Sequence, residues 1–265
     1  MPIEKLPETH FVVSAFLERD VKIDFYLPSG NNVSSCKKLL LINDGQDLVT
    51  MDFQNILGKL YEENKIIPLV CAGIHCGPDR RNEYGTADIL NENGLGAKAH
   101  LYTRFILEEL LPFINGKYGM PFEEKSFCGF SLGGLSAFDI VWNHSEEFTK
   151  AGVFSGSFWW RSVPQDNEDF NEEDHRIIHN EIKNGKFHPG LKFFFEAGAL
   201  DETADRNHNG IIDSIDDTVS LIEELIKKGY DVGKDINYLE LKNGRHNVST
   251  WAQAFPEFLI WNWGK

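Results

Sequence analysis

The sequence is poor in cysteine and has fewer basic than acidic residues, and both shortages narrow the classes of protein it can be. Among 265 residues there are 4 Cys, 26 Lys and Arg together, and 41 Asp and Glu together, so the formal net charge at pH 7 is −15. The cysteines do not have the spacing of a metal site, so we expect buried, reduced thiols in a cytoplasmic protein. The excess of negative charge argues against nucleic acid and anionic membranes as partners.

Long apolar runs are missing as well. No segment approaches the roughly 18 consecutive apolar residues of a membrane-spanning helix. Residues 1–10 lack the basic stretch followed by an apolar one that marks a signal peptide, so none is predicted. The remaining composition, with 42% hydrophobic and 25% charged residues, is that of an ordinary globular protein, and the length suits a single α/β domain over residues 1–265.

Strand-like and helix-like patterns alternate along the chain after an opening pair of strands. The runs at 10–17 and 21–27 flank a charged turn and predict an antiparallel N-terminal hairpin, followed by a loop at 28–32. Further apolar runs predict strands at 38–43, 66–74, 126–130, 150–158, 192–198 and 236–241, and helical spacing predicts helices at 52–64, 97–118, 132–142, 216–228 and 248–263. Pro112 would kink the second of these helices near its end. The alternation implies an α/β fold with a mostly parallel central sheet and helices on both faces.

Two polar segments are too long to be simple connections. They cover residues 75–96 and 159–190, and the second is an insertion with one short helical pattern around 173–182. Loops of this length usually carry function, for example as lids or substrate walls.

The stretch Gly129-Phe130-Ser131-Leu132-Gly133 matches the G-x-S-x-G nucleophile elbow, in which a serine occupies a sharp turn between a strand and a helix. The glycines suit such a turn because side chains there would collide with neighbouring backbone. A plain glycine-rich turn is the alternative, since a motif this short also occurs by chance. The predicted strand before it and helix after it favour the elbow, and free N–H groups at the start of a helix favour negative charge at Ser131.

A serine nucleophile needs a base, and the base needs a carboxylate to orient it. In α/β-hydrolases the acid and then the histidine follow the serine along the chain. Of nine histidines, only His246 lies between the last predicted strand and a helix, which makes it the predicted base; a solvated or capping histidine is the alternative. Asp201, just past a late strand, is the predicted acid, with Glu202 and then Glu196 as alternatives.

The tetrahedral intermediate of acyl transfer also needs hydrogen-bond donors for its oxyanion. The N–H of Leu132, directly after the serine, is the first predicted donor. The second is the N–H of Gln46, in the turn after the 38–43 strand, with Gly45 or Asp47 as alternatives. The competing interpretation of that turn is a plain β-turn.

Together these segments resemble the putative-esterase family of α/β-hydrolases, which groups enterochelin-esterase-like enzymes, feruloyl and acetyl-xylan esterases, and mycolyltransferases. The resemblance covers nearly the whole chain and rests on residues 40–46, 81–84, 109–114, 129–134, 154–160, 201–202 and 244–246. It implies the α/β-hydrolase fold without a lid and a Ser131–His246–Asp201 triad. The sequence departs from the family pattern in one place. The family often has Gly-Gly-His followed by Trp, whereas here Arg245 stands between Gly244 and His246, and the next tryptophan is Trp251.

The resemblance also implies a substrate crevice lined by Arg81, Tyr84, Trp159 and Trp160. Adjacent residues of a strand point to opposite faces, so one tryptophan of the pair should be buried and the other should face the crevice. Arg81 could bind a carboxylate or phenolate of the substrate or could anchor its own loop.

A second motif, at residues 205–216, fits the twelve-position calcium loop of an EF-hand. Asp or Asn occupies positions 1, 3, 5 and 9, Gly210 occupies position 6, and Asp replaces the usual Glu at position 12, as in dockerin-type loops; the helix that normally enters the loop is missing. The predicted ligands are Asp205, Asn207, Asn209, Ile211, Asp213 and Asp216, and the alternative is an Asx-rich loop without metal. We expect a structural Ca²⁺ that stiffens the loop carrying Asp201, and no cofactor for catalysis.

The sequence therefore predicts a serine carboxylic ester hydrolase that forms an acyl-enzyme on Ser131. Its substrate would be a small-molecule, carbohydrate or siderophore ester. An acyltransferase on the same triad and a non-catalytic carbohydrate- or siderophore-binding protein are the alternatives, and the oligomeric state is left open.

Overall fold

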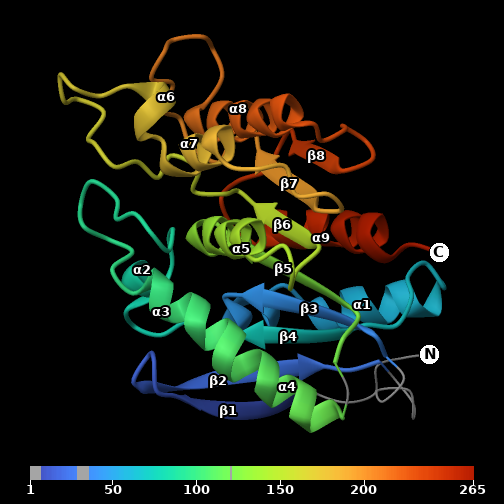
Figure 1. Cartoon of the computed structure of the whole chain (residues 1–265). Helices are drawn as coiled ribbons and strands as arrows, with labels where there is room; N and C mark the ends of the chain where they lie inside the picture. Colours follow the sequence, from blue (N-terminus) through green and yellow to red (C-terminus); the bar gives the residue numbers. More distant parts are fainter. Residues whose placement is uncertain (1–6, 29–35, 120) are drawn as a thin grey trace.

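The computed structural model describes residues 7–28, 36–119 and 121–265, so most of the loop predicted at 28–32 lies outside the described residues. The described chain is built on one eight-stranded sheet with the strand order β1-β2-β4-β3-β5-β6-β7-β8 (Figure 1). β1 (Glu8–Ser14) and β2 (Arg19–Tyr26) form the predicted antiparallel hairpin, and β2 runs antiparallel to β4 (Val70–Ile74). All other neighbours in the sheet are parallel, which confirms the predicted fold class.

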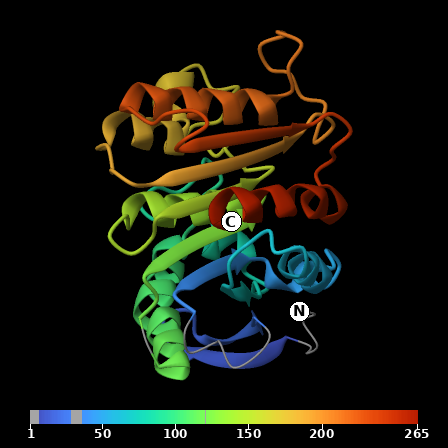
Figure 2. The same ribbon diagram turned by 90° about the vertical axis from the view of Figure 1, so that its right-hand side faces the viewer.

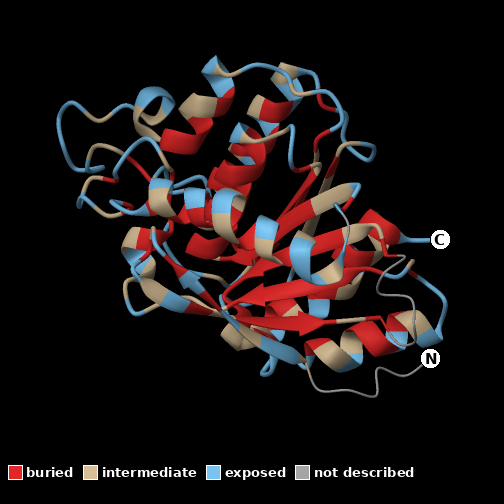
Figure 3. Ribbon diagram, turned by 60° about the horizontal axis from the view of Figure 1, so that its bottom comes forward, coloured by how far each residue is buried: buried red, intermediate tan, exposed pale blue. Residues whose placement is uncertain are grey.

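The central strands are buried along most of their length (Figure 3). They are β4, β3 (Lys38–Asn43), β5 (Glu124–Phe130), β6 (Lys150–Phe154) and β7 (Lys192–Gly198), while β8 (Ile236–Leu241) is an edge strand in which only Ile236 is buried. Alternate side chains of these strands enter two hydrophobic clusters, one on each face of the sheet. Helices cover both faces of the sheet, so side chains on both sides of these strands are buried. This explains the continuous apolar runs in the sequence.

One face of the sheet is covered by α1 (Phe53–Glu62) and α9 (Val248–Trp263), which lie on the same side in Figure 2. The opposite face is covered by α5 (Leu132–Asn143), α7 (Ile177–Asn184), α8 (Asp213–Lys228) and a long helix that starts with α3 (Ala99–Arg104). This arrangement confirms the prediction of helices on both faces.

The long helix differs from the single kinked helix predicted over 97–118. Its middle, η3 (Phe105–Leu110), is π-helical, and α4 (Leu111–Tyr118) follows. Pro112 is the second residue of α4, which directly follows the π-helical segment, so the break in α-helical hydrogen bonding that a proline causes falls at the junction of the two.

Two predicted strands are shorter than expected. The strand predicted at 66–74 begins at Val70, because Pro68 has no N–H to donate to a ladder, and Ile66 makes an isolated bridge with Gly264 instead. The strand predicted at 150–158 ends at Phe154, because Ser155 adopts a positive φ of 47° that breaks extended backbone.

The two long polar segments contain short helices. α2 (Arg80–Glu83) lies in the first segment, and α6 (Glu172–His175) precedes α7 in the second. Within the described residues, no helix is long and apolar enough to cross a bilayer.

Candidate active site

Ser131 occupies a strained turn between β5 and α5. Its φ is 55° and its ψ is −124°, a conformation that non-glycine residues rarely adopt. A Cβ atom at Gly129 would overlap the carbonyl of Gly133, and one at Gly133 would lie 2.6 Å from Asp44 Oδ2. The backbone geometry is therefore that of the nucleophile elbow, and both glycines are required for close approach.

Asp201 and His246 lie on neighbouring loops, after β7 and between β8 and α9. The loops are joined by a hydrogen bond from Leu200 N to Gly244 O of 2.8 Å. Asp201 Oδ2 is 3.9 Å from His246 Nδ1, with the carboxylate buried (1% exposed) and the imidazole 41% exposed. The structure thus brings the predicted acid and base together.

Charge and burial set the protonation of His246. Burial lowers its pKa, the Asp201 carboxylate opposes that shift, and the positive charge of Arg80 adds to it, so that the pKa lies below its ordinary value. The imidazole is therefore neutral at pH 7 and able to accept a proton.

The hydroxyl of Ser131 has a partner that the sequence did not reveal. Ser131 Oγ lies 3.4 Å from Ser157 Oγ, and Ser157 N donates to Ser131 O at 3.2 Å. Within the described residues, no hydrogen bond joins Ser131 to His246. Hydrogen bonds between catalytic groups are often loose without substrate and tighten when it binds.

The two predicted oxyanion donors lie in the first turns of two helices. Leu132 begins α5, and Gln46 lies in the first turn of η2 (Gly45–Leu48), where backbone N–H groups have no intrahelical partner. The two segments are tied together, because Asn43 Nδ2 donates to Gly133 O at 2.8 Å. Gly45 allows the turn to pack on the next strand, since a Cβ there would lie 2.6 Å from Gly73 O.

Arg80, and not the predicted Arg81, is the arginine beside the elbow. Its Nε and Nη2 bind the carboxylate of Asp44 at 2.7 and 2.6 Å, and Nη2 also reaches Phe130 O at 3.4 Å. Arg81 is exposed, and its main-chain oxygen accepts from Gly96 N. The only signal in the sequence was the adjacent pair of arginines, and spacing alone does not say which of two neighbours turns inward.

Two side chains assigned to the crevice wall are buried. Tyr84 is 0% exposed, and its hydroxyl accepts from Asp44 N at 3.3 Å, so it supports the turn from below and does not line the crevice. Trp160 is 1% exposed, whereas Trp159 is 39% exposed. The predicted division of the pair is observed, but the pair follows the end of β6, so the division arises from a turn and not from strand alternation.

The two alternative acids, Glu202 and Glu196, have hydrogen-bond partners other than His246. Glu202 Oε1 accepts from Ser214 N at 2.6 Å, on the side of the 205–216 loop. Glu196 is 1% exposed, and its Oε2 is 3.5 Å from Ser155 Oγ, which also accepts from Trp251 Nε1 at 2.9 Å. Burial and the nearby charge of Asp201 raise the pKa of Glu196 to about 8, so this carboxyl is protonated at pH 7.

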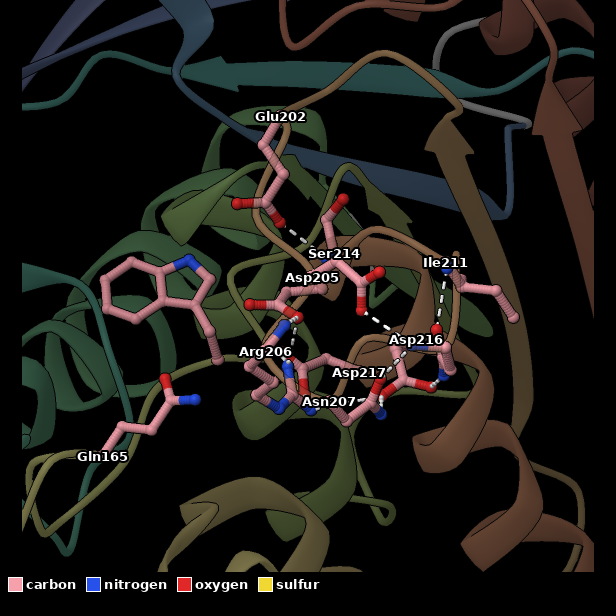
Figure 4. A network of polar contacts seen from close by, with 12 residues as sticks. Gln165, Glu202, Asp205, Arg206, Asn207, Ile211, Ser214, Asp216 and Asp217 are labelled. Carbon is pink, nitrogen blue, oxygen red and sulfur yellow. Dashed lines mark hydrogen bonds and ion pairs between the residues drawn. The ribbon is translucent and has the colours of Figure 1, made fainter.

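The predicted calcium loop is held by its own polar groups (Figure 4). Asp205 accepts from Asn209 N and Gly210 N at 3.1 and 2.9 Å, and Asn209 Oδ1 accepts from Ile211 N at 2.7 Å. Asp216 accepts from the Asn207 amide at 3.2 Å.

Arg206 occupies the middle of this network. Its guanidinium pairs with Asp213, Asp216 and Asp217 at 3.3, 3.4 and 2.5 Å. Across residues 7–28, 36–119 and 121–265, no group of three or more His, Cys, Asp or Glu side chains is arranged to hold a metal ion. The calcium site stays a prediction.

The order of the strands, the elbow after β5 and the covering helices are those of the α/β-hydrolase fold. The chain belongs to the family described as "Putative esterase", whose family model matches residues 14–262, and it is an esterase of that family.

Similar proteins come from several bacteria. The uncharacterized protein YbbA of Bacillus subtilis (strain 168) is 24% identical over 257 residues, covering 92% of this chain and 93% of YbbA. The enterobactin esterase FES of Shigella flexneri, solved in the presence of enterobactin, superposes with a TM-score of 0.74 at 19% identity, covering 98% of this chain and 59% of that one. A ferulic acid esterase superposes with a TM-score of 0.71 at 14% identity, covering 98% of both chains. This chain therefore spans only about three-fifths of the enterobactin esterase.

Proposed function

We propose that the protein is a serine carboxylesterase in which Ser131 attacks the ester carbonyl and forms an acyl-enzyme. The observation that carries this proposal is the strained elbow at Ser131, with the Asp201–His246 pair on the loops at the same end of the sheet. His246 Nε2 takes the proton of Ser131 Oγ as the new C–O bond forms, and passes it to the leaving alkoxide as the ester bond breaks. Water then attacks the acyl-enzyme and gives its proton to His246. As the bond between the acyl carbon and Ser131 Oγ breaks, His246 returns that proton to Oγ, and the carboxylic acid is released.

In this mechanism Asp201 orients the imidazole and stabilises the imidazolium that forms. Its burial supports the role, because a charge held away from water acts more strongly on its neighbour. The 3.9 Å separation of Asp201 Oδ2 and His246 Nδ1 needs only a small side-chain adjustment to become a hydrogen bond.

The proposed oxyanion hole consists of the N–H groups of Leu132 and Gln46. The bidentate pair of Arg80 and Asp44 supports this role, because it holds the turn that precedes Gln46 against the elbow. Donors that are already in place need no reorganisation when the negative charge develops.

The substrate class that we propose is a small-molecule ester. It is supported by the family and by structural neighbours described as an enterobactin esterase and a ferulic acid esterase. We also propose a cytoplasmic location, which is supported by the free thiols of Cys36, Cys71, Cys76 and Cys128.

Replacing Ser131 by Ala tests the proposal. We expect hydrolysis of p-nitrophenyl acetate by purified Ser131→Ala to fall by roughly 10³-fold or more, because the nucleophile is lost, with an unchanged far-ultraviolet circular dichroism spectrum. Ser162→Ala, a serine of the 159–190 segment away from the elbow, is the matched control and should keep wild-type turnover. Turnover retained by a folded Ser131→Ala variant refutes the assignment.

A further inference from the structure

A pocket of about 370 Å³ is lined in part by residues that neighbour the proposed catalytic residues in the sequence. Its lining comes from three segments, and the residues are Glu92, Trp159, Arg161, Pro164, Gln165, Asp166, Glu202 and Asp213. Trp159 is two residues from Ser157, whose hydroxyl is 3.4 Å from Ser131 Oγ, and Glu202 directly follows Asp201. One end of an ester held at Ser131 can therefore extend into this pocket.

The pocket carries an excess of negative charge. Glu92, Asp166 and Glu202 have no cationic partner within the part of the chain that the structure describes, whereas Asp213 pairs with Arg206 at 3.3 Å. Glu202 and Asp213 line the same pocket, so their like charges repel one another. A positive group that entered the pocket would relieve this repulsion.

Arg161 is the one basic residue of the lining, and it is already engaged. It is 7% exposed, its Nε donates to Trp159 O at 2.9 Å, and its Nη1 donates to Gln165 Oε1 at 2.6 Å. Its guanidinium also lies 5.4 Å from the centre of the Phe170 ring. These contacts fix Trp159 and Gln165 but do not neutralise the guanidinium. Arg161 therefore offsets one of the three unpaired carboxylates, and two negative charges remain in excess in the pocket.

Trp159 gives the pocket an aromatic wall. It is 39% exposed, although the neighbouring Trp160 is 1% exposed and the two rings are 5.7 Å apart. An indole face attracts cations, including quaternary ammonium groups, and the attraction adds to that of nearby carboxylates. An aromatic wall together with unpaired carboxylates is the chemistry that recognises an organic cation.

We propose that this pocket is a specificity subsite for a cationic group of the ester substrate, an ammonium or a guanidinium. The inference rests on the proposed esterase function and names the substrate class within it. The cation lies against Trp159 and is neutralised by Asp166, Glu202 and Glu92, while the ester carbonyl lies at Ser131.

The test compares cationic esters with neutral esters of the same shape. One pair is acetylthiocholine and 3,3-dimethylbutyl thioacetate, with the cation on the alcohol side. The second is p-nitrophenyl 4-guanidinobenzoate and p-nitrophenyl 4-isobutylbenzoate, with the cation on the acyl side. With EDTA present, we expect kcat/KM for the cationic ester of at least one pair to exceed that of its neutral partner roughly fivefold or more. That preference should shrink as NaCl rises from about 0.05 to about 0.5 M, because salt screens exposed charges.

Variants locate the preference in the pocket. Asp166→Asn and Trp159→Leu should each reduce the ratio of cationic to neutral kcat/KM by roughly two- to threefold. Glu168→Gln removes the same charge from an exposed residue of the same loop that does not line the pocket, and it should leave the ratio unchanged.

Ratios near or below one in both pairs, or a preference that survives both variants, overturn the subsite. These results leave the esterase proposal intact as long as the neutral esters are hydrolysed in a Ser131-dependent way. If no ester of either pair is hydrolysed, the proposed function and the subsite both fail.

Discussion

At the scale of single residues, the imidazole of His246 is subject to three influences. Burial and Arg80 disfavour its protonated form and Asp201 favours it, and the net effect lowers its pKa. Because the base must be neutral to accept the proton of Ser131, kcat/KM should rise with pH through a single proton loss. We expect the midpoint to lie below the ordinary histidine value of about 6.5 and the plateau to be reached by about pH 7.

The measurement is the pH profile of kcat/KM for p-nitrophenyl acetate between about pH 5 and pH 8. Asp201→Asn serves as the comparison, since it removes the charge that raises the pKa of His246. Its midpoint should move further toward acid, and its kcat should fall by roughly 10³- to 10⁴-fold. A wild-type midpoint above 7 would contradict the account of His246.

Glu196 supplies a second prediction, on stability. Its pKa is about 8 in the folded protein, above the ordinary glutamate value, so the folded state binds a proton that the unfolded state releases. Between about pH 4.5 and pH 8 the folded state holds more protons, and the stability contributed by this group is lost as pH rises through that range. Glu196→Gln keeps the neutral shape without the titration.

We therefore expect the advantage of Glu196→Gln over wild type to grow by on the order of 4 kcal/mol between about pH 5 and pH 9, measured by chemical unfolding. Glu240→Gln, at an exposed position of the neighbouring strand β8, should show no such growth. An equal effect of Glu196→Gln at both pH values would show that Glu196 is ionised throughout.

The sequence predicted some residues of the site and missed others for a physical reason. Ser131, Asp201 and His246 follow from chain order and from turn chemistry, both of which are local. Arg80 and Ser157 depend on which side of a turn faces the elbow, and this is decided by tertiary contacts such as the Arg80–Asp44 pair. The family resemblance placed Tyr84 on the crevice wall, and no periodic pattern in the sequence indicated its burial beneath Asp44.

At the scale of elements, the 205–216 loop joins β7 to α8 and begins four residues after Asp201. Its residues match the calcium-loop pattern. However, α8 already begins at Asp213, and Arg206 pairs with two carboxylates of the loop, Asp213 and Asp216, and with Asp217 beyond it. The pattern therefore predicts a cation, and the contacts show how the same loop is stabilised by an arginine.

If calcium binds this loop, removing it should lower stability and loosen the loop that carries Asp201. We expect EDTA to lower the thermal midpoint by a few degrees and the esterase rate by a modest factor, with both restored by Ca²⁺ and not by Mg²⁺. Asp205→Ala should abolish the response to Ca²⁺. Should chelation change neither the midpoint nor the rate, the loop is an Asx-rich turn without metal.

The elements themselves were predicted best where burial alone decides them. The strands at 38–43 and 192–198 and the helix at 248–263 have the predicted bounds, because their side chains fill the two clusters on either side of the sheet. The edge strand at 236–241 also has the predicted bounds, although only Ile236 of it is buried. The π-helical η3 was not predicted, since apolar spacing does not distinguish a π-helical turn from an α-helical one.

At the scale of the whole molecule, one sheet places the three proposed catalytic residues at the same end. Ser131 follows β5, Asp201 follows β7 and His246 follows β8, and these strands are parallel within the sheet. The carboxyl ends of parallel strands meet at one edge, where α/β folds place their ligand sites. The alternating strand and helix pattern predicted a parallel sheet with such an edge. The negative charge of the pocket was not predicted, because its lining residues come from three segments that only the fold brings together.

The central claim is that Ser131 is a nucleophile activated by this arrangement. The most direct measurement is labelling of the folded protein with a fluorophosphonate, followed by mass spectrometry of its peptides. We expect one adduct, on the peptide that contains Ser131, formed much more slowly in His246→Ala and absent in Ser131→Ala. A folded wild-type protein that stays unlabelled at Ser131, or that carries the label on another residue while ester hydrolysis continues, would contradict the account.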